Sequence, residues 1–252
     1  NRPTLLSEFN KLPLSIQDFI YLEDDGIIFL ACSDMELKSR IEAYITNTNL
    51  PWESKEQTHI SVGAFFAFKV LYNPDKGFKF EKVYAKSFQE QTGCISWNKA
   101  SNTIHIGLDS GKMVFFKLNP DSNFTQYEQY IEFKPHKDRV TGIKYDAGTG
   151  YIYSVGADKK FYITEIGYLN NPCEILDGPC GFTGLYEDID NQRIFLTNEL
   201  GMVLVYLAQS FPPLLVNSIQ LSSEAPIKSL DMSLLKSYIF TACSDGQIIV
   251  LD

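Results

Sequence analysis

The sequence predicts an all-β fold made of repeated four-stranded units, and three observations support this. An apolar strand, a small polar turn and a second apolar strand recur five times at a spacing of about 45 residues. The turn residues of the five copies are Asp34, Asp109, Asp158, Glu199 and Asp245. Aromatic residues make up 13% of the chain, and aromatic and β-branched side chains suit pleated, half-buried surfaces. No stretch keeps a helical period beyond two turns. These features are typical of β-propeller blades.

The first unit contains three strands that can be predicted from their apolar residues, at Ile16–Ile20, Ile27–Ser33 and Ala64–Val70. The interval from Asp34 to Asp109 is longer than any of the three later intervals. We therefore expect an insertion in blade one, at about residues 35–60.

This insertion carries much of the non-repeat character of the chain, including Pro51, Trp52 and a short predicted helix over Glu36–Tyr44. One interpretation is a tolerated surface loop. The other is a docking element, since long loops on rigid scaffolds often carry function. Trp52 is the candidate protein contact, because aromatic anchors dominate the energetics of interfaces.

The later units follow the same order of strands. Their apolar positions alternate or run continuously over short segments, as expected for strands buried between blades. The predicted inner strands are Cys94–Trp97, Val140–Tyr145, Gly181–Tyr186 and Ile227–Leu230. Third strands are predicted at Phe161–Ile166 and Met202–Leu207, and outer strands at Tyr127–Phe133 and Pro213–Leu221. We assign residues 15–252 to one propeller. Residues 1–14 form a separate N-terminal segment, in which Thr4–Phe9 is a candidate ring-closing outer strand.

Composition and charge restrict the class of partner. The formal net charge is −9 and the sequence pI is about 4.9. An acidic surface disfavours nucleic-acid backbones and anionic lipid headgroups. No apolar run approaches the roughly 20 residues of a membrane span, so we expect no direct membrane insertion. The five cysteines contain no Cys-x-x-Cys pair, which favours a reducing, cytoplasmic location.

No cluster of residues predicts catalysis, a metal or a cofactor. His59, His105 and His136 are far apart, and none has a neighbour at ligand spacing. We expect His105 to pack on a surface or between blades, and His136 to bond locally in the loop that enters blade three. The acidic segments Glu23–Asp25 and Glu187–Asp190 are interpreted as turns, with calcium binding as a weaker alternative.

Two segments resemble WD-repeat proteins. Pro135-His136-Lys137-Asp138-Arg139-Val140-Thr141-Gly142-Ile143 is similar to that family's entry to an inner strand, and Ser154-Val155-Gly156-Ala157-Asp158 to the end of its second strand. The closing Trp-Asp is absent, and the Trp position is held by Phe116, Thr164, Tyr206 and Leu251. The resemblance implies a degenerate WD40-like propeller in which the five visible blades are part of a ring of seven. It also implies that the family's Asp-His-Ser-Trp hydrogen-bond chain is incomplete, with apolar and aromatic stacking in its place.

Further phrases resemble the propeller of WD-repeat proteins that carry a FYVE zinc finger. They are Cys94–Asn98, Ile106–Gly111, His136–Thr141, Gly156–Phe161 and Arg2–Leu6. The Cys-x-x-Cys pairs and the Arg-His-His-Cys run that a FYVE finger needs do not occur in these 252 residues.

The leading functional hypothesis is a non-catalytic scaffold that mediates protein–protein interactions in the cytoplasm as a subunit of a hetero-oligomeric complex. The alternative is the propeller part of an endosomal, phosphoinositide-linked adaptor on the cytosolic face of endosomes, with its FYVE finger outside this chain. A third hypothesis is an enzyme with a polar central pocket. The inner strands supply only Asp18, with Glu187 and Asp231 just beyond their ends, so we expect no enzyme.

Overall fold

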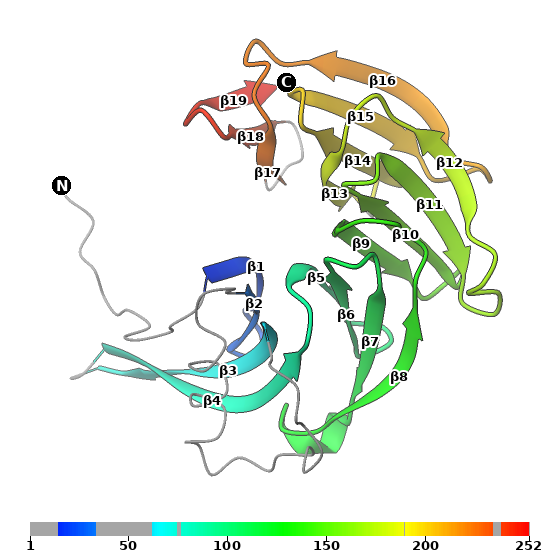
Figure 1. The fold of residues 1–252 in the computed structure, drawn as a ribbon. Helices are drawn as coiled ribbons and strands as arrows, with labels where there is room; N and C mark the ends of the chain where they lie inside the picture. Colours follow the sequence, from blue (N-terminus) through cyan, green and yellow to red (C-terminus); the bar gives the residue numbers. More distant parts are fainter. Residues whose placement is uncertain (1–14, 34–61, 75–76, 189, 234–237, 252) are drawn as a thin grey trace.

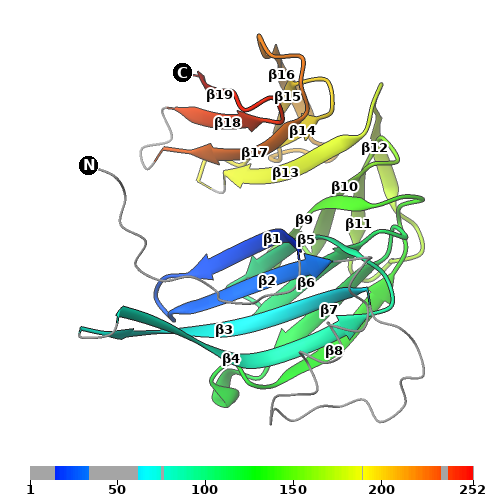
Figure 2. The same ribbon diagram turned by 60° about the vertical axis from the view of Figure 1, so that its left-hand side comes forward.

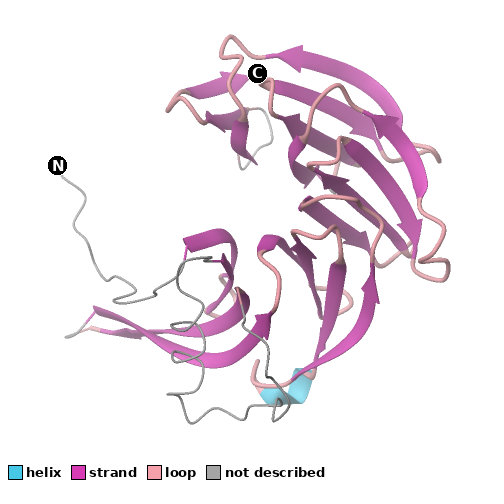
Figure 3. Ribbon diagram, in the orientation of Figure 1, coloured by secondary structure: helices cyan, strands magenta, loops and turns pink. Residues whose placement is uncertain are grey.

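Five antiparallel β-sheets follow one another along the chain and surround a common axis, so the computed structural model is a β-propeller (Figure 1). It describes residues 15–33, 62–74, 77–188, 190–233 and 238–251. Blades one to four each have four strands, and the described part of blade five has three. Apart from one short 3-10 helix, the regular structure of the described residues is entirely strand (Figure 3). The predicted all-β propeller of antiparallel blades is confirmed, and the seven-blade ring stays a prediction.

The strands run from the axis to the rim in chain order within each blade. Blade one contains β1 (Ser15–Leu22), β2 (Ile27–Ser33), β3 (Gly63–Asn73) and β4 (Gly77–Phe88). Blade two contains β5 (Thr92–Asn98), β6 (Thr103–Leu108), β7 (Met113–Leu118), the 3-10 helix η1 (Pro120–Ser122) and β8 (Tyr127–Phe133). Blade three contains β9 (Val140–Asp146), β10 (Tyr151–Gly156), β11 (Lys160–Glu165) and β12 (Cys173–Asp177). Blade four contains β13 (Phe182–Asp188), β14 (Arg193–Asn198), β15 (Met202–Leu207) and β16 (Leu214–Gln220), and blade five β17 (Ile227–Met232), β18 (Ile239–Cys243) and β19 (Ile248–Leu251).

The predicted strands overlap observed strands in every blade, at the rim as well as near the axis. β8 and β15 have the predicted bounds. No bounds were predicted for the outer strands β4 and β12, whereas those of the equally exposed outer strands β8 and β16 were predicted. The insertion of blade one falls between β2 and β3, and residues 34–61 lie outside the described residues. Trp52 and the helix predicted over Glu36–Tyr44 are therefore untested, as is the N-terminal segment 1–14.

The blades form an arc in which each inner strand contacts the next (Figures 1 and 2). β1 contacts β5, β5 contacts β9, β9 contacts β13, and β13 contacts β17. Among the described strands, no comparable contact joins β17 back to β1. Blades one and five are thus the two ends of the described arc.

The core lies between the blades. Phe29 and Phe65 of blade one and Phe116 of blade two are almost completely buried and belong to one cluster. Further clusters fill the spaces between blades two and three, three and four, and four and five. Removing a Phe side chain from water stabilises the fold by roughly 1.5–3 kcal/mol, so each junction contributes through a few large residues. Side chains on both faces of the middle blades are therefore apolar.

Every inner strand contains a β-bulge at the same position. The register with the second strand shifts by one residue near the start of the inner strand, and the extra residues are Gln17, Gly93, Thr141, Thr183 and Lys228. A bulge bends the strand and redirects one side chain. The repeat thus places one extra residue per blade beside the axis.

The face of blade five that points away from blade four carries the same kind of apolar pair that is buried between blades four and five. Phe195 pairs with Val205 in blade four, and Phe240 pairs with Val250 at the same register in blade five. Phe195 and Val205 are 1% and 7% exposed, whereas Phe240 and Val250 are 41% and 52% exposed. The difference arises because blade five covers the first pair, and no described residue covers the second.

Candidate functional site

The loops that enter the inner strands and the turns between second and third strands lie at the same end of the propeller, which we call the entry face. In four blades a backbone N–H of the turn donates to a carbonyl of the entry loop at 2.8–3.1 Å. The pairs are Asp109 to Gln91, Ala157 to Arg139, Glu199 to Gly181 and Ser244 to Pro226. These bonds hold the loops rigidly, so that side chains on them keep fixed positions.

A buried hydrogen-bond chain anchors the entry face in blade three. His136 Nδ1 lies 2.9 Å from Asp158 Oδ1, and His136 Nε2 lies 3.0 Å from Ser154 Oγ. The second oxygen of Asp158 accepts from the backbone N–H of Lys137 at 2.9 Å. Burial raises the pKa of Asp158, but the hydrogen bonds from His136 and Lys137 outweigh it and hold the pKa below its usual range.

These hydrogen bonds differ from the expectation that His136 bonds locally in the loop that enters blade three. They join the entry loop to β10 and to the following turn, because the turn brings Asp158 back beside His136. The chain stops at Ser154: Thr164 occupies the position of the family's Trp, and its buried hydroxyl has no partner among the described residues. Because His136 and Ser154 are both buried, this Asp-His-Ser arrangement is structural and offers no accessible nucleophile.

Arg139 joins three blades on the entry face. Its Nε lies 2.6 Å from Asp109 Oδ1 of blade two, and its Nη2 donates to Gln17 Oε1 of blade one and to the carbonyl of Thr92, both at 3.3 Å. The Arg139 and Asp109 side chains are about one-third exposed, at 35% and 36%. A partner that approaches this face therefore meets a positioned ion pair near the axis.

A cavity of about 320 Å³ lies along the axis and opens among the inner strands. All five bulge residues line it, so the repeated bulge shapes its wall. Thr141 and Thr183 are bonded within the wall: the Thr141 hydroxyl donates to the carbonyl of Phe182 at 2.8 Å, and the hydroxyls of Thr183 and Thr197 lie 2.9 Å apart. Lys228 forms no ion pair with a described residue and leaves a cationic group at the wall.

Two acidic residues that are far apart in the sequence, Asp18 and Glu187, both lie on inner strands. Asp18 accepts from the backbone N–H groups of Phe19 and Ile95, each at 2.9 Å. Burial raises its pKa despite these bonds and the nearby charge of Lys144. Burial likewise raises the pKa of Glu187, and Lys144 opposes the shift. No hydrogen bond joins Asp18, Lys144 and Glu187 to one another in the described part of the chain. The arrangement lacks the direct contacts of an acid–base pair.

The other polar residues singled out from the sequence have structural partners. Asp188 is buried and pairs with Arg193 Nη2 at 2.7 Å, and its carboxylate also accepts from Asn191. Asp24 pairs with Lys99 across two blades at 2.9 Å. These contacts support the interpretation of both acidic segments as turns. Within the described ranges, no group of three or more His, Cys, Asp or Glu side chains could hold a metal ion.

His105 is buried between blades two and three. Its ring lies 4.2 Å from Phe115 and 5.4 Å from Tyr145, and Nε2 bonds to Thr103 Oγ1 at 2.9 Å. The inter-blade position agrees with the expectation for this residue. Burial lowers the pKa of His105 to about 3, so the ring is neutral at physiological pH. His59 lies outside the described residues.

The cysteines are all free thiols, and only Cys173 is exposed. Burial raises the pKa of Cys32 to about 12, and it raises the pKa of Cys94 further. These two thiols are therefore protonated and unreactive at neutral pH.

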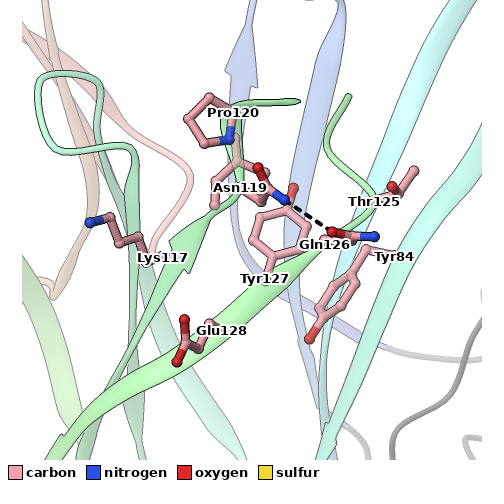
Figure 4. Close-up of a pocket in the computed structure, with 9 residues that line it drawn as sticks. Tyr84, Lys117, Asn119, Pro120, Thr125, Gln126, Tyr127 and Glu128 are labelled. Carbon is pink, nitrogen blue, oxygen red and sulfur yellow. Dashed lines mark hydrogen bonds between the residues drawn. The ribbon is translucent and has the colours of Figure 1, made fainter. Parts of the chain in front are cut away.

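A second cavity, of about 560 Å³, lies between blade one and the loop that joins β7 to β8 (Figure 4). Tyr84 and Tyr127 line it with their ring centroids 4.4 Å apart, and Asn119 Nδ2 donates to Gln126 Oε1 at 3.0 Å. The buried hydroxyl of Tyr127 has no hydrogen-bond partner among the described residues. Sequence reasoning missed this cavity, because Tyr84 and Tyr127 are far apart in the chain. It offers aromatic and amide groups without a catalytic arrangement.

The fold defines the class of this protein as a β-propeller. No family model matches the chain. In sequence it is similar to human WD repeat and FYVE domain-containing protein 2, at 26% identity over 204 residues, which cover 79% of this chain and 48% of that protein. The mouse protein of the same name is 24% identical over 204 residues, with the same shares covered. The chain thus spans about half the length of these curated relatives. The matches confirm the resemblance to WD-repeat propellers.

Two solved structures share the fold. A chain in the crystal structure of the mitotic checkpoint complex has a TM-score of 0.63 at 12% identity, with 96% of this chain and 62% of that chain covered. The computationally designed Ika8 protein has a TM-score of 0.57 at 13% identity, with 94% and 58% covered. No helix of the described residues is long and apolar enough to cross a membrane.

Proposed function

We propose that this protein is a non-catalytic scaffold that binds protein partners through the entry face of its propeller, as a subunit of a hetero-oligomeric complex in the cytoplasm. The observation that carries this proposal is the Arg139 network, which fixes partly exposed side chains from three blades on one rigid surface. Rigid surfaces bind with a small loss of conformational freedom. The similarity to WD-repeat relatives supports the same class of function.

The test compares charge reversals at opposite ends of the molecule, at Arg139, whose side chain is 35% exposed, and at Lys99, whose side chain is 76% exposed. Arg139→Glu should lower the recovery of co-purifying proteins at least tenfold, because it replaces the central cation of the entry face. Lys99→Glu, in a turn at the other end, is the matched control and should leave recovery unchanged. Quantitative mass spectrometry of affinity-purified protein measures both. Equal recovery with the two variants would contradict binding through the entry face.

We propose Trp52 as a partner contact of the insertion at about 35–60. Trp52→Ala, and separately removal of residues 36–58, should each weaken binding of the partners identified above. The expected loss for Trp52→Ala is about 2 kcal/mol, the usual scale of an aromatic hot spot. Isothermal titration calorimetry with a purified partner measures it. Unchanged affinity with both variants would show that the insertion is only a surface loop.

A second candidate function is the propeller part of an endosomal adaptor. The observation that favours it is that both curated relatives are named for a FYVE domain as well as WD repeats. Sequencing the complete coding region tests for the paired Cys-x-x-Cys motifs of such a finger. Imaging the full-length protein against an early-endosome marker then tests the location, and a diffuse cytoplasmic signal would contradict it.

A further inference from the structure

Blade four has an outer half without charge. No Asp, Glu, Lys or Arg occurs from Leu200 to Ser223, although 21% of the chain is charged. This stretch contains β15 and β16, the third and outermost strands of the blade. The rim of blade four therefore lacks the charges found elsewhere on the surface.

The other outer strands carry the charges that normally protect a sheet edge from pairing with another chain. They are Lys79, Glu81, Lys82 and Lys86 in β4, Glu128 and Glu132 in β8, and Glu174 and Asp177 in β12. β16 has none. One of its edges pairs with β15, and no described strand pairs with the other.

The free edge of β16 is also apolar. Leu214, Leu215 and Val216 are 59%, 46% and 47% exposed. The polar side chains of the strand bond within their own blade: Gln220 Nε2 donates to the carbonyl of Leu200 at 2.7 Å, and Asn217 Oδ1 accepts from the backbone N–H of Ser218 at 2.8 Å. No charged side chain of β16 opposes an incoming strand.

We propose that β16 is a self-association site, where a second copy of this chain adds its own β16 in antiparallel orientation. The charge distribution favours a second copy, because two molecules of net charge −9 repel each other least where their surfaces are uncharged. A partner strand with charges would face an apolar edge that offers it no counter-ion. β16 itself meets the requirement for an extended, uncharged segment.

The antiparallel pairing is self-complementary about Asn217. It places Leu215 opposite Ile219, and Val216 opposite Ser218, in both directions, which gives the closed two-fold symmetry of most homodimers. Two four-stranded blades then join into one continuous sheet. The Asn217 amide turns aside to release the N–H of Ser218 for the pairing.

Sedimentation equilibrium of the protein over a range of concentrations tests the proposal. The wild-type protein should form dimers, and Val216→Lys should weaken association at least tenfold, because it buries an unpaired charge at the pairing edge. Gln129→Lys adds the same charge to the outer strand β8 and should leave association unchanged. Ile248→Lys does the same on the exposed face of blade five and should also leave it unchanged. A monomeric wild type, a Val216→Lys dimer of unchanged affinity, or loss of the dimer in Ile248→Lys would each overturn the proposal.

Cross-linking gives a readout that does not depend on the folding of the lysine variant. In a Cys173→Ser background, which removes the exposed native thiol, Asn217→Cys should form an intermolecular disulfide under mild oxidation. Directly opposed residues of antiparallel strands lie within the Cα separation that a disulfide spans, about 4.4–6.8 Å. Gln129→Cys is the control and should form no intermolecular disulfide, because β8 lies outside the proposed pairing edge. Equal cross-linking at both positions would contradict pairing through β16.

Discussion

His105 and His136 are both buried, yet their surroundings differ. Both ring nitrogens of His136 have partners, in Asp158 and Ser154. Only Nε2 of His105 has one, and its Nδ1 is buried without a hydrogen bond to a described residue. Burial among aromatic rings therefore disfavours the charged form of His105, and this makes the residue a source of acid sensitivity.

We expect His105 to reduce the stability of the fold as the pH falls. Its pKa is about 3 in the folded protein and 6.5 in the unfolded chain, so below pH 6.5 only the unfolded chain gains a proton. Stability should fall by about 1.4 kcal/mol between pH 7.5 and 5.5 from this group alone. Urea unfolding of wild type and His105→Gln at both pH values measures the difference. An equal pH dependence in the two proteins would refute this assignment.

At the scale of the strands, adjacent inner strands approach so closely that some positions accept only glycine. A Cβ on Gly142 would lie 2.6 Å from the backbone nitrogen of Leu185 and 2.7 Å from its Cβ. Gly142 is in β9 and Leu185 is in β13, so the contact is between neighbouring blades. The absence of a side chain at this position lets β9 and β13 pack together.

Gly142→Ala should destabilise the protein by about 1–3 kcal/mol, the usual range for overpacking a core. The clash is with backbone, which cannot rotate aside as the end of a flexible side chain can. Gly167→Ala is the matched control, because a Cβ there meets no atom within 4 Å. Thermal unfolding measures both, and a similar melting temperature for the two variants would contradict the close approach of the blades.

At the scale of the whole molecule, the stability of each blade depends on the blade that covers it. The Phe195–Val205 pair is buried by blade five, and the equivalent Phe240–Val250 pair lies on the exposed face of blade five. A Phe–Val pair at the same register therefore contributes more to the free energy of unfolding in blade four than in blade five.

Val205→Thr should cost about 1–3 kcal/mol, because it buries a hydroxyl at the junction of two blades. Val250→Thr should cost less than about 0.5 kcal/mol, as expected at an exposed position. Chemical denaturation of residues 1–252 measures both values. An equal cost would contradict the exposure of this face of blade five.

The sequence by itself determined the repeat, the all-β class and the position of most strands near the axis. It could do so because most second and third strands are buried on both faces, and their apolar runs record this burial directly, as in β15. The outer strands β4 and β12 were missed although the similarly exposed outer strands β8 and β16 were predicted, so exposure at the rim alone does not explain the difference.

Only the tertiary structure decided which distant residues meet. It placed Asp158 beside His136, brought Arg139 to Asp109 and Gln17, and gathered the five bulge residues around the axial cavity. A bulge is a shift of register between two strands, and a single strand's residue pattern does not record its pairing. The candidate site depends on contacts between blades, so it became visible only when the blades were assembled around their axis.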